Sequence, residues 1–375
     1  MKQKPLRIIL DIIRILLGIT FIFSGFVKGV DPLGSTYKFT DYFTAFGTDW
    51  ASQFSFILSV LQSLFEFGIG AALLINYRVA IFSWFSLLFM AFFLPLTLWI
   101  AIKNPVSDCG CFGDALILSN WDTFFKNIVL SLFAVIVFIY RNDYKNKLNI
   151  RVPFLGFVLL LLAMGFVEFY SYNHLPIIDF RPYKIGSNIR KGMEMPANAP
   201  QDVFKNEFIY KERATGKLKK FDEANYPWKD SLNWQYVQMK SKLVKKGYHP
   251  PIHDFTIENS YGEDVADYYL NEPNNTFMLI AYNLDKTSTK NQEKINELAR
   301  KAIENGDHFI CMTASSAQDI EQFKAKYQPP YDFFFCDEIT LKTMIRSNPG
   351  LMLTREGTII DYWHWRDIPS YNEVK

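Results

Sequence analysis

The chain has 375 residues, and its 40 Lys and Arg against 38 Asp and Glu leave a formal net charge of +2. So small an excess, with basic residues mainly near one predicted membrane boundary, excludes the basic footprint of a nucleic-acid-binding protein, and we expect no nucleic-acid partner. The charges are unevenly spread, with 23 of 78 in residues 1–172 and 55 in residues 173–375. We therefore predict an α-helical membrane bundle over 1–172 and a polar part after it.

Five apolar segments in the first part approach the roughly 20 residues that a helix needs to cross a bilayer. The first has a basic start but no small-residue cleavage site, and more segments follow. It is therefore predicted to be an anchor rather than a removed signal peptide. This interpretation makes the lipid bilayer a partner. The segments are Ile8–Val27, Phe54–Ile75, Val79–Ile102, Phe124–Tyr140 and Val152–Tyr170.

Short loops rich in Lys and Arg stay in the cytoplasm, so the positions of these residues indicate how the chain is oriented in the membrane. The opposite loops, near 28–53 and 103–123, carry three lysines balanced by aspartates. We expect a bacterial inner-membrane protein with a cytoplasmic amino terminus. Everything after Tyr170 is then periplasmic, as is the loop near 103–123, and disulfides persist there. The residues that set this orientation are Lys2, Lys4, Arg7, Arg78, Arg141, Lys145, Lys147 and Arg151.

Two ionisable residues lie inside predicted spans, Arg14 in the first and Glu66 in the second. A charge at membrane depth costs about 3 kcal/mol or more unless it is paired. With about 1.5 Å of rise per residue, the two side chains lie at depths that let them meet. They form a candidate polar pair at a small-molecule or quinone pocket. The simpler interpretation is a structural ion pair, with Asp11 as an alternative partner for Arg14.

Two of the four cysteines, Cys109 and Cys111, stand one residue apart in a short polar loop. Such a pair can close a small disulfide ring, and Gly110 tolerates the backbone distortion that the ring requires. A strained, exposed disulfide tends to oxidise other thiols, which makes the pair the candidate catalytic site. A static disulfide, free thiols and a metal ligand pair are the other interpretations. Zinc is disfavoured because the loop has no histidine, and we predict no metal site.

Four motifs carry a family resemblance: Arg14-x-x-x-Gly18, Phe23–Pro32, Glu66-x-x-Ile69-Gly70 and Asp108–Gly113. Over roughly residues 5–140 they resemble the DoxX/MauE family of membrane proteins. The resemblance implies a four-helix membrane bundle, to which this chain adds a fifth transmembrane helix, and a structural role for Gly113. MauE-like members are linked to maturation of methylamine dehydrogenase and DoxX-like members to quinone-coupled sulfur oxidation. A quinone is therefore the implied candidate cofactor.

Residues 173–250 are predicted to be a partly structured linker region. Segments 207–211 and 218–221 alternate in polarity around Ala214-Thr215-Gly216, which predicts a hairpin. A helix is predicted over Asn233–Lys246, with its lysines on a solvated face.

Residues 251–375 alternate strands with helices and close on a hairpin, which predicts an α/β sheet. Over about 251–370 this part resembles thioredoxin-like domains, and the resemblance implies that Pro349 is the structural cis-proline. A Cys-x-x-Cys motif is missing after Asn283-Leu284, so we expect a degenerate domain without dithiol chemistry. Cys311 and Cys336 lie on predicted strands as structural residues, either buried hydrophobes or a disulfide. The elements expected are strands at 254–257, 276–283, 309–312, 333–336, 350–353 and 358–362, and helices at 292–304, 320–327 and 341–345.

Two functions stay open. The first is a redox-accessory protein that supports thiol–disulfide or quinone-linked chemistry, or maturation of a periplasmic client protein; as an enzyme it would be a membrane thiol–disulfide oxidoreductase. The second is a non-enzymatic scaffold whose exported domain binds an envelope or membrane complex.

Overall fold

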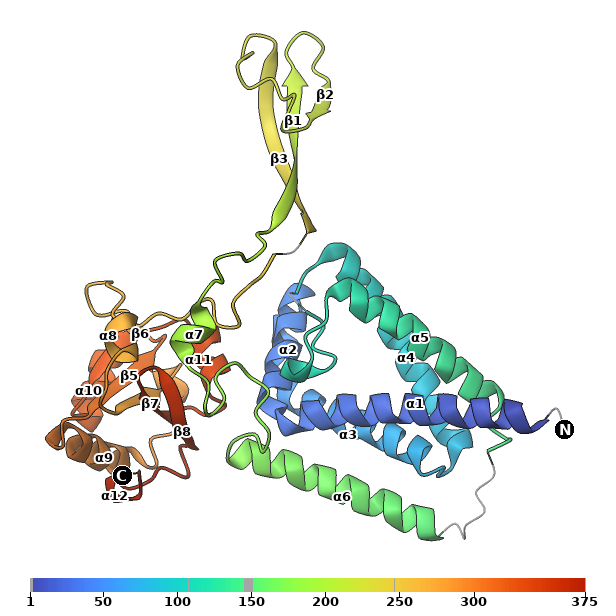
Figure 1. Ribbon diagram of the computed structural model, residues 1–375, viewed down its shortest axis with the longest axis horizontal. Coiled ribbons are helices and arrows are strands. Elements are labelled where there is room, and N and C mark those ends of the chain that lie inside the picture. The colour runs from blue at the N-terminus through green and yellow to red at the C-terminus, as the bar shows by residue number, and fades with distance from the viewer. Residues whose placement is uncertain (1–2, 107, 145–150, 246, 375) are drawn as a thin grey trace. The chain divides into compact units, whose positions relative to one another are not determined.

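The structure is a computed structural model that describes residues 3–106, 108–144, 151–245 and 247–374 (Figure 1). Of the basic residues used above, Lys2, Lys145, Lys147 and Lys246 lie outside these ranges. The chain forms two compact units, which are described separately. The first contains residues 1–187 and 256–375, and the second contains residues 188–255.

The first unit begins with a helical region. Within the described residues, four helical segments are long and apolar enough to cross a membrane: Asp49–Leu74, Val79–Lys103, Asn120–Ile139 and Arg151–Asn173. They coincide with the last four predicted spans. The first predicted span lies within a continuous helix that carries Asp11, Arg14 and Lys28 and is not one of these four. The elements are α1 (Gln3–Val30), α2 (Pro32–Ala45), η1 (Asp49–Phe54), α3 (Ser55–Leu74), α4 (Val79–Lys103), η2 (Gly113–Ala115), α5 (Asn120–Ile139) and α6 (Arg151–Asn173).

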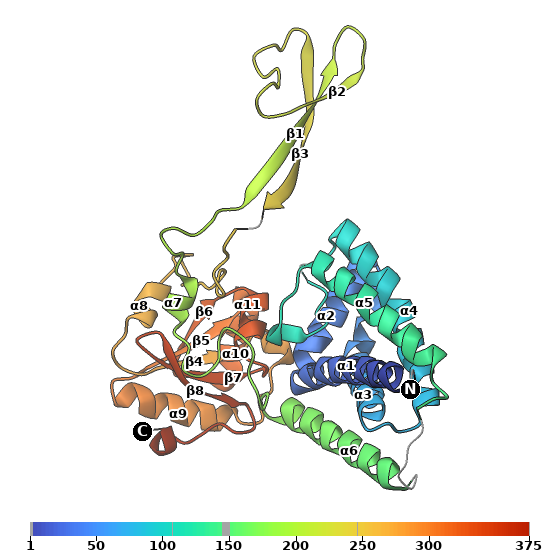
Figure 2. The ribbon, with the colours of Figure 1, turned by 45° about the vertical axis from the view of Figure 1, so that its right-hand side comes forward.

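Glycines set the close packing of α1 on α3. A Cβ atom at Gly70 would lie 2.6 Å from the Gly18 carbonyl oxygen, and one at Gly25 would lie 2.5 Å from the Phe67 amide nitrogen. Small residues of this kind let helix backbones approach closely inside a membrane. Figures 1 and 2 show α1 lying along α3, and α4 along α5. Leu17 of α1 is buried in the apolar core of this bundle.

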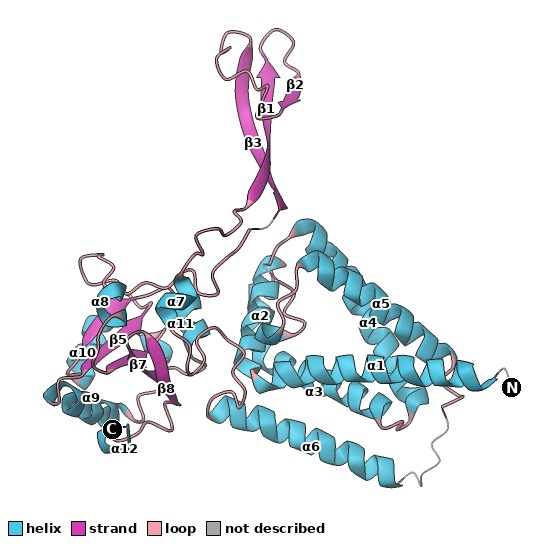
Figure 3. Cartoon of the chain, viewed as in Figure 1, coloured by secondary structure: helices cyan, strands magenta, loops and turns pink. Residues whose placement is uncertain are grey.

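The second unit contains α7 (Ile189–Met193) and an antiparallel sheet in the order β2-β1-β3. Its strands are β1 (Val203–Glu212), β2 (Leu218–Phe221) and β3 (Trp234–Lys245), drawn in magenta in Figure 3. The predicted hairpin is confirmed, because Phe208 pairs with Phe221 and Lys211 with Leu218. The predicted helix over Asn233–Lys246 is wrong. Its residues Trp234–Lys245 form β3, and pairing along the full length of β1 overrides the helix-like spacing of the lysines.

The C-terminal α/β domain, residues 256–375, has a five-stranded sheet in the order β6-β5-β4-β7-β8. Strands β4, β5 and β6 run parallel, and β7 and β8 are antiparallel to their neighbours. The predicted elements from Thr276 onward are confirmed, although β4 ends at Ile280 and β6 ends at Phe335, so that Cys336 lies just after this strand rather than on it. Segment 254–257 forms no strand and is followed by isolated bridges at Glu258. The elements are α8 (Ala266–Leu270), β4 (Thr276–Ile280), η3 (Leu284–Lys286), α9 (Gln292–Glu304), β5 (His308–Thr313), α10 (Ala317–Tyr327), β6 (Asp332–Phe335), α11 (Glu338–Met344), β7 (Gly350–Arg355), β8 (Thr358–His364) and α12 (Tyr371–Val374).

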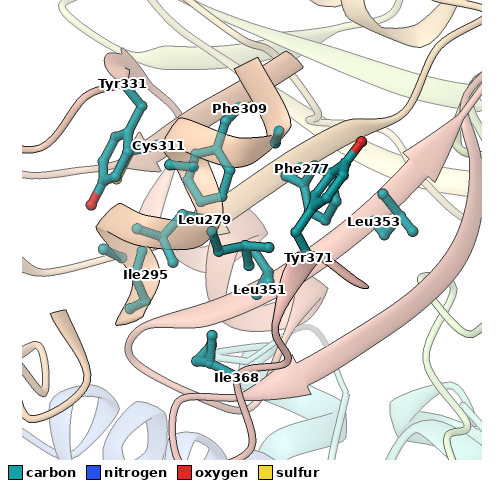
Figure 4. Packing of buried hydrophobic residues seen from close by; sticks show 14 of the residues in the cluster. Phe277, Leu279, Ile295, Phe309, Cys311, Tyr331, Leu351, Leu353, Ile368 and Tyr371 are labelled. Carbon is teal, nitrogen blue, oxygen red and sulfur yellow. The ribbon is translucent and has the colours of Figure 1, made fainter. Parts of the chain in front are cut away.

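One part of the core of this domain lies on one face of the sheet, where Phe277, Phe309 and Leu351 meet Ile295 of α9 (Figure 4). The alternate strand residues, such as Met278 and Met352, are also buried, so both faces of the sheet are covered. Cys311 belongs to this core. Cys336 is also buried, and both thiols are free. Cys311 is paired with Phe333 across β5 and β6. Cys336 therefore lies three positions, roughly 10 Å, farther along, which is beyond the reach of a disulfide. The Asn348–Pro349 peptide bond is cis.

Candidate functional site: the cysteine loop and the bundle cavity

The segment between α4 and α5 that carries Cys109 and Cys111, here called the cysteine loop, is held in place by α2. Lys38 of α2 forms an ion pair with Asp108, with 2.8 Å between Nζ and Oδ2. The Asp108 carboxylate also accepts a hydrogen bond from the Gly110 amide at 2.9 Å. Gly110 and Gly113 have φ values of +65° and +50°, in the left-handed region that glycine adopts at little cost. The turn at Gly110 lies between the two cysteines, and the turn at Gly113 follows them, with the Gly113 amide donating to the Gly110 carbonyl oxygen at 3.1 Å.

The two cysteine sulfurs lie 3.0 Å apart, and both thiols are free. Cys109 is buried and Cys111 half-buried. The Tyr42 hydroxyl donates to the Cys109 carbonyl oxygen at 2.8 Å and so anchors the loop to α2. The predicted cysteine pair is thus brought together, and its thiols can act as one unit.

The pKa values of the two thiols are shifted in opposite directions. A hydrogen bond from the Cys109 thiol, with smaller contributions from the charges of Lys126 and Lys28, lowers the pKa of Cys111 to about 6 despite the burial of that sulfur. The same contact, together with burial, raises the pKa of Cys109 well above its usual value. At neutral pH the loop therefore holds one thiolate, at Cys111, and thiolates are the nucleophilic form of cysteine.

A buried ion pair joins α1, α3 and the cysteine loop. The Lys28 ammonium lies 2.8 Å from Glu66 Oε2, 2.7 Å from Ser24 Oγ and 2.7 Å from the Cys111 carbonyl oxygen. The Glu66 carboxylate also accepts a hydrogen bond from Gln62 at 2.6 Å. The partner of Glu66 is therefore Lys28 and not Arg14, so the predicted Arg14–Glu66 contact is wrong.

The contact of Gly18 with Gly70 sets the register that separates Arg14 from Glu66. In this register Arg14 is level with Leu73, whose carbonyl oxygen accepts from its guanidinium. The guanidinium also lies 3.4 Å from Asp11, the alternative partner named from the sequence, and 5.6 Å from the Tyr144 ring centre. Arg14 thus has a structural environment away from the cysteine loop.

A cavity of about 210 Å³ lies inside the bundle beside the cysteine pair. Cys109, Cys111, Lys28, Glu66 and Lys126 are among its polar lining residues. The rest of the lining is mainly apolar and includes Phe21, Phe39, Phe43, Phe89, Phe93 and Leu130. The arrangement places two thiols in the wall of a small, mostly apolar cavity.

Comparison with known proteins matches the bundle to one family. Residues 6–140 match the model described as methylamine utilisation protein MauE. These residues form a MauE-family membrane domain. The match includes α2 to α5 and the cysteine loop but leaves out α6 and everything after it. Residues 204–246 match a domain of unknown function, DUF8463, and no curated protein and no solved structure matches the chain.

The C-terminal domain contacts the MauE domain through Arg346. Its guanidinium lies 2.9 Å from Asp31 and 3.2 Å from Asp114, with the arginine side chain only 6% exposed. Asp114 stands three residues after Cys111, at the end of the cysteine loop. A second cavity of about 640 Å³ is lined by Arg346 and these two aspartates, and Gly110 and Lys38 line both cavities.

Sequence reasoning missed the roles of Lys28, Tyr42 and Arg346. Lys28 was counted only as a loop charge, although its i−4 spacing from Ser24 places both on one face of α1. Tyr42 lies outside every predicted element. Arg346 sits beside the Asn348-Pro349-Gly350 segment, and nothing local in the sequence indicates a partner more than 200 residues earlier.

Proposed function

We propose that this protein is a membrane redox-accessory protein in which Cys109 and Cys111 form an exchangeable dithiol–disulfide couple. The observation that carries the proposal is the 3.0 Å separation of the two sulfurs in the wall of the bundle cavity. The MauE family is linked to methylamine utilisation, which supports a membrane accessory role. The lowered pKa of Cys111 supports exchange rather than a static loop, because a thiolate of low pKa is a good leaving group.

The client protein is oxidised by two successive thiol–disulfide exchanges, in which no electrons are lost. A thiolate of a client dithiol attacks Cys109 of the Cys109–Cys111 disulfide, the S–S bond breaks, and Cys111 leaves as a thiolate. The second client thiol then displaces Cys109 from the mixed disulfide. The client gains a disulfide, and the cysteine pair gains two electrons and two protons.

Reoxidation of the pair uses a quinone-class acceptor in the bundle cavity. Return to the disulfide releases two electrons and two protons, which is the oxidation chemistry that a quinone supplies when it is bound. A volume of about 210 Å³ is below the roughly 300–1,000 Å³ of pockets for drug-sized ligands, so it suits a single ring. The Lys126 ammonium, 4.1 Å from the Phe112 ring centre, lines the cavity and would hold a carbonyl oxygen.

In this proposal the protein lies in a bacterial inner membrane with its amino terminus in the cytoplasm. The cysteine loop and the C-terminal domain then share the periplasm, where client thiols are oxidised. The C-terminal domain resembles thioredoxin-like domains but carries Asp285-Lys286 where a cysteine pair would stand. It serves to bring the client protein to the loop.

Trapping tests the proposal. In cells that normally make the protein, Cys109 of Cys111→Ser should attack a client disulfide, the reverse of the second step above. One client thiolate leaves, and a mixed disulfide between Cys109 and the client should accumulate on non-reducing gels. Cys311→Ser, which changes a buried core thiol, is the matched control and should trap nothing. A Cys111→Ser protein that is present at normal level and captures no partner overturns the proposal.

The scaffold alternative makes the opposite prediction. The Arg346 contact with Asp31 and Asp114 favours it, because it ties the C-terminal domain to the membrane domain without any chemistry. A scaffold would keep its function in the Cys109→Ser/Cys111→Ser double variant and lose it on truncation after Tyr170. Loss of function in the double variant rejects the scaffold.

A further inference from the structure

Lys28 uses all three of its ammonium protons on neighbours that belong to three segments. Glu66 is on α3, Ser24 is one turn earlier on α1, and the Cys111 carbonyl oxygen is in the cysteine loop. The side chains of Lys28 and Glu66 are 9% and 2% exposed. The ion pair is therefore a rigid connection between the bundle core and the backbone of Cys111.

Bundle stability does not explain this ion pair. Burying two charges is costly, and apolar residues of similar volume often serve as well or better. The α1–α3 contact is already made by Gly18, Gly25 and Gly70 and by the surrounding apolar core. The Cys111 carbonyl oxygen also accepts from the Ser24 hydroxyl at 2.8 Å, so what apolar residues could not supply at this place is a positive charge beside Cys111.

We propose that Lys28, held in place by Glu66 and Ser24, is a positioning residue that fixes the Cys-Gly-Cys loop and stabilises Cys111 as the thiolate of the redox pair. This inference deepens the proposed function and rests on it. Lys28 acts through its hydrogen bond to the carbonyl oxygen, which fixes the loop, and through its charge, which favours the thiolate over the thiol. Glu66 opposes this charge effect while it holds the ammonium in place.

The charged and titratable groups around Cys111 come from several elements. Cys109 donates to its sulfur, Lys28 and Lys126 favour the thiolate, and Glu66 disfavours it. The Tyr42 hydroxyl donates to the Cys109 carbonyl oxygen and also interacts electrostatically with Cys111. Because Lys28 and Glu66 have opposite signs, their removal should shift the acidity of Cys111 in opposite directions. A purely structural role would loosen the loop in both cases and shift it the same way.

The test measures the alkylation rate of Cys111 against pH in the reduced, purified full chain, with the modified cysteine identified by mass spectrometry. Lys28→Gln keeps a donor for the carbonyl oxygen but loses the charge, so the pH midpoint should rise by about one unit. Glu66→Gln removes the negative charge, so the midpoint should fall. Lys103→Met, an exposed lysine at the end of α4, and Glu168→Gln, a buried carboxyl bonded to Ser63, should leave the midpoint unchanged.

Equal midpoints in wild type and Lys28→Gln, or shifts of the same sign in Lys28→Gln and Glu66→Gln, overturn the inference. Lys28→Arg keeps the charge, so its pH midpoint should stay near that of wild type. This variant still tests the inference if Lys28→Gln fails to fold. A raised midpoint in a folded Lys28→Arg protein also counts against the inference. The measurement needs no client and no quinone. Opposite shifts with no mixed disulfide in the trapping experiment would therefore retain the Lys28 role and reject the proposed function.

Discussion

Arg346 of the C-terminal domain forms an ion pair with Asp31 at the start of α2, and its Nε lies 3.0 and 2.9 Å from the two carboxylate oxygens. Asp31 is also the N-cap of α2, because its side chain accepts a hydrogen bond from the Gly34 amide. The helix it caps carries Lys38 and Tyr42, which hold the cysteine loop. One arginine thus ties the C-terminal domain to the element that holds the loop of Cys109 and Cys111.

Replacing Arg346 with methionine should weaken this contact strongly. Removal of one partner from a buried ion pair costs about 3–5 kcal/mol, less here because Asp114 is 36% exposed. We expect a lower thermal midpoint in detergent and faster proteolysis between the MauE domain and residue 256. Arg355→Met, which removes an exposed arginine bonded to Asn275, should change neither. An unchanged midpoint in Arg346→Met would show that the contact contributes little.

A leucine at Gly70 should disrupt the bundle. Its Cβ would lie 2.5 Å from the Ile22 amide nitrogen, and such backbone contacts cannot be relieved by a rotamer change. Overpacking typically costs about 1–3 kcal/mol and more where backbones must separate. The thermal midpoint of the full chain should fall well below that of Gly165→Leu, because a Cβ at Gly165 meets nothing within 4 Å. Equal midpoints would contradict the glycine-mediated packing of α1 on α3.

His364 should make the stability of the chain depend on pH. Burial on β8 lowers its pKa to about 4, and the charge of Arg366 adds to the effect. The unfolded chain, with a histidine pKa near 6.5, takes up a proton that the folded chain does not. The contribution is therefore complete above pH 6.5 and is lost as pH falls toward 4, by at most about 3 kcal/mol.

The thermal midpoint at several pH values checks this dependence. His364→Asn should flatten the decrease between pH 6.5 and pH 4, whereas His253→Asn, at an exposed histidine, should leave it as in wild type. A wild-type decrease that survives in His364→Asn would assign the dependence to other groups.

The four cysteines should react at different rates with a small permeant alkylating agent. Cys311 and Cys336 are 1% and 0% exposed, and burial raises the pKa of Cys336 to about 12. After reduction of the folded protein at neutral pH, mass spectrometry should find Cys111 modified first and Cys311 and Cys336 unmodified until the chain unfolds. Modification of Cys311 in the native state would mean that the core of the C-terminal domain opens readily.

The sequence predicts elements well where one pattern dominates. Helix α9 begins and ends where the amphipathic spacing of Gln292–Glu304 places it, and β4 follows from an unbroken apolar run. Segment 233–246 carries two patterns at once, aromatic and β-branched residues of a strand and a lysine spacing typical of a helix. Its structure is decided by pairing with β1, whose residues lie 22 to 42 positions earlier in the chain, and local reasoning has no access to that contact.

The candidate site is predictable only in part for a related reason. Cys109, Gly110 and Cys111 stand together in the sequence, so their joint role can be predicted from it. The partner of Glu66 depends on the register of α1 against α3, which the glycine contacts set and which an estimate of depth from predicted span ends does not supply. That estimate places Arg14 within reach of Glu66, whereas Lys28, the residue that pairs with Glu66, lies about 21 Å farther along α1.

Gly110 and Lys38 line both the bundle cavity and the larger cavity beside Arg346, so the cysteine loop and α2 lie between the two. The sulfurs line the first cavity, which is mainly apolar, whereas charged side chains from two domains line the second. In the proposed function, an apolar oxidant would meet the thiols on one side of the loop, while the opposite side, lined by charges, faces the C-terminal domain that brings the client. The two reactants would then exchange electrons through the same cysteines without sharing one solvent.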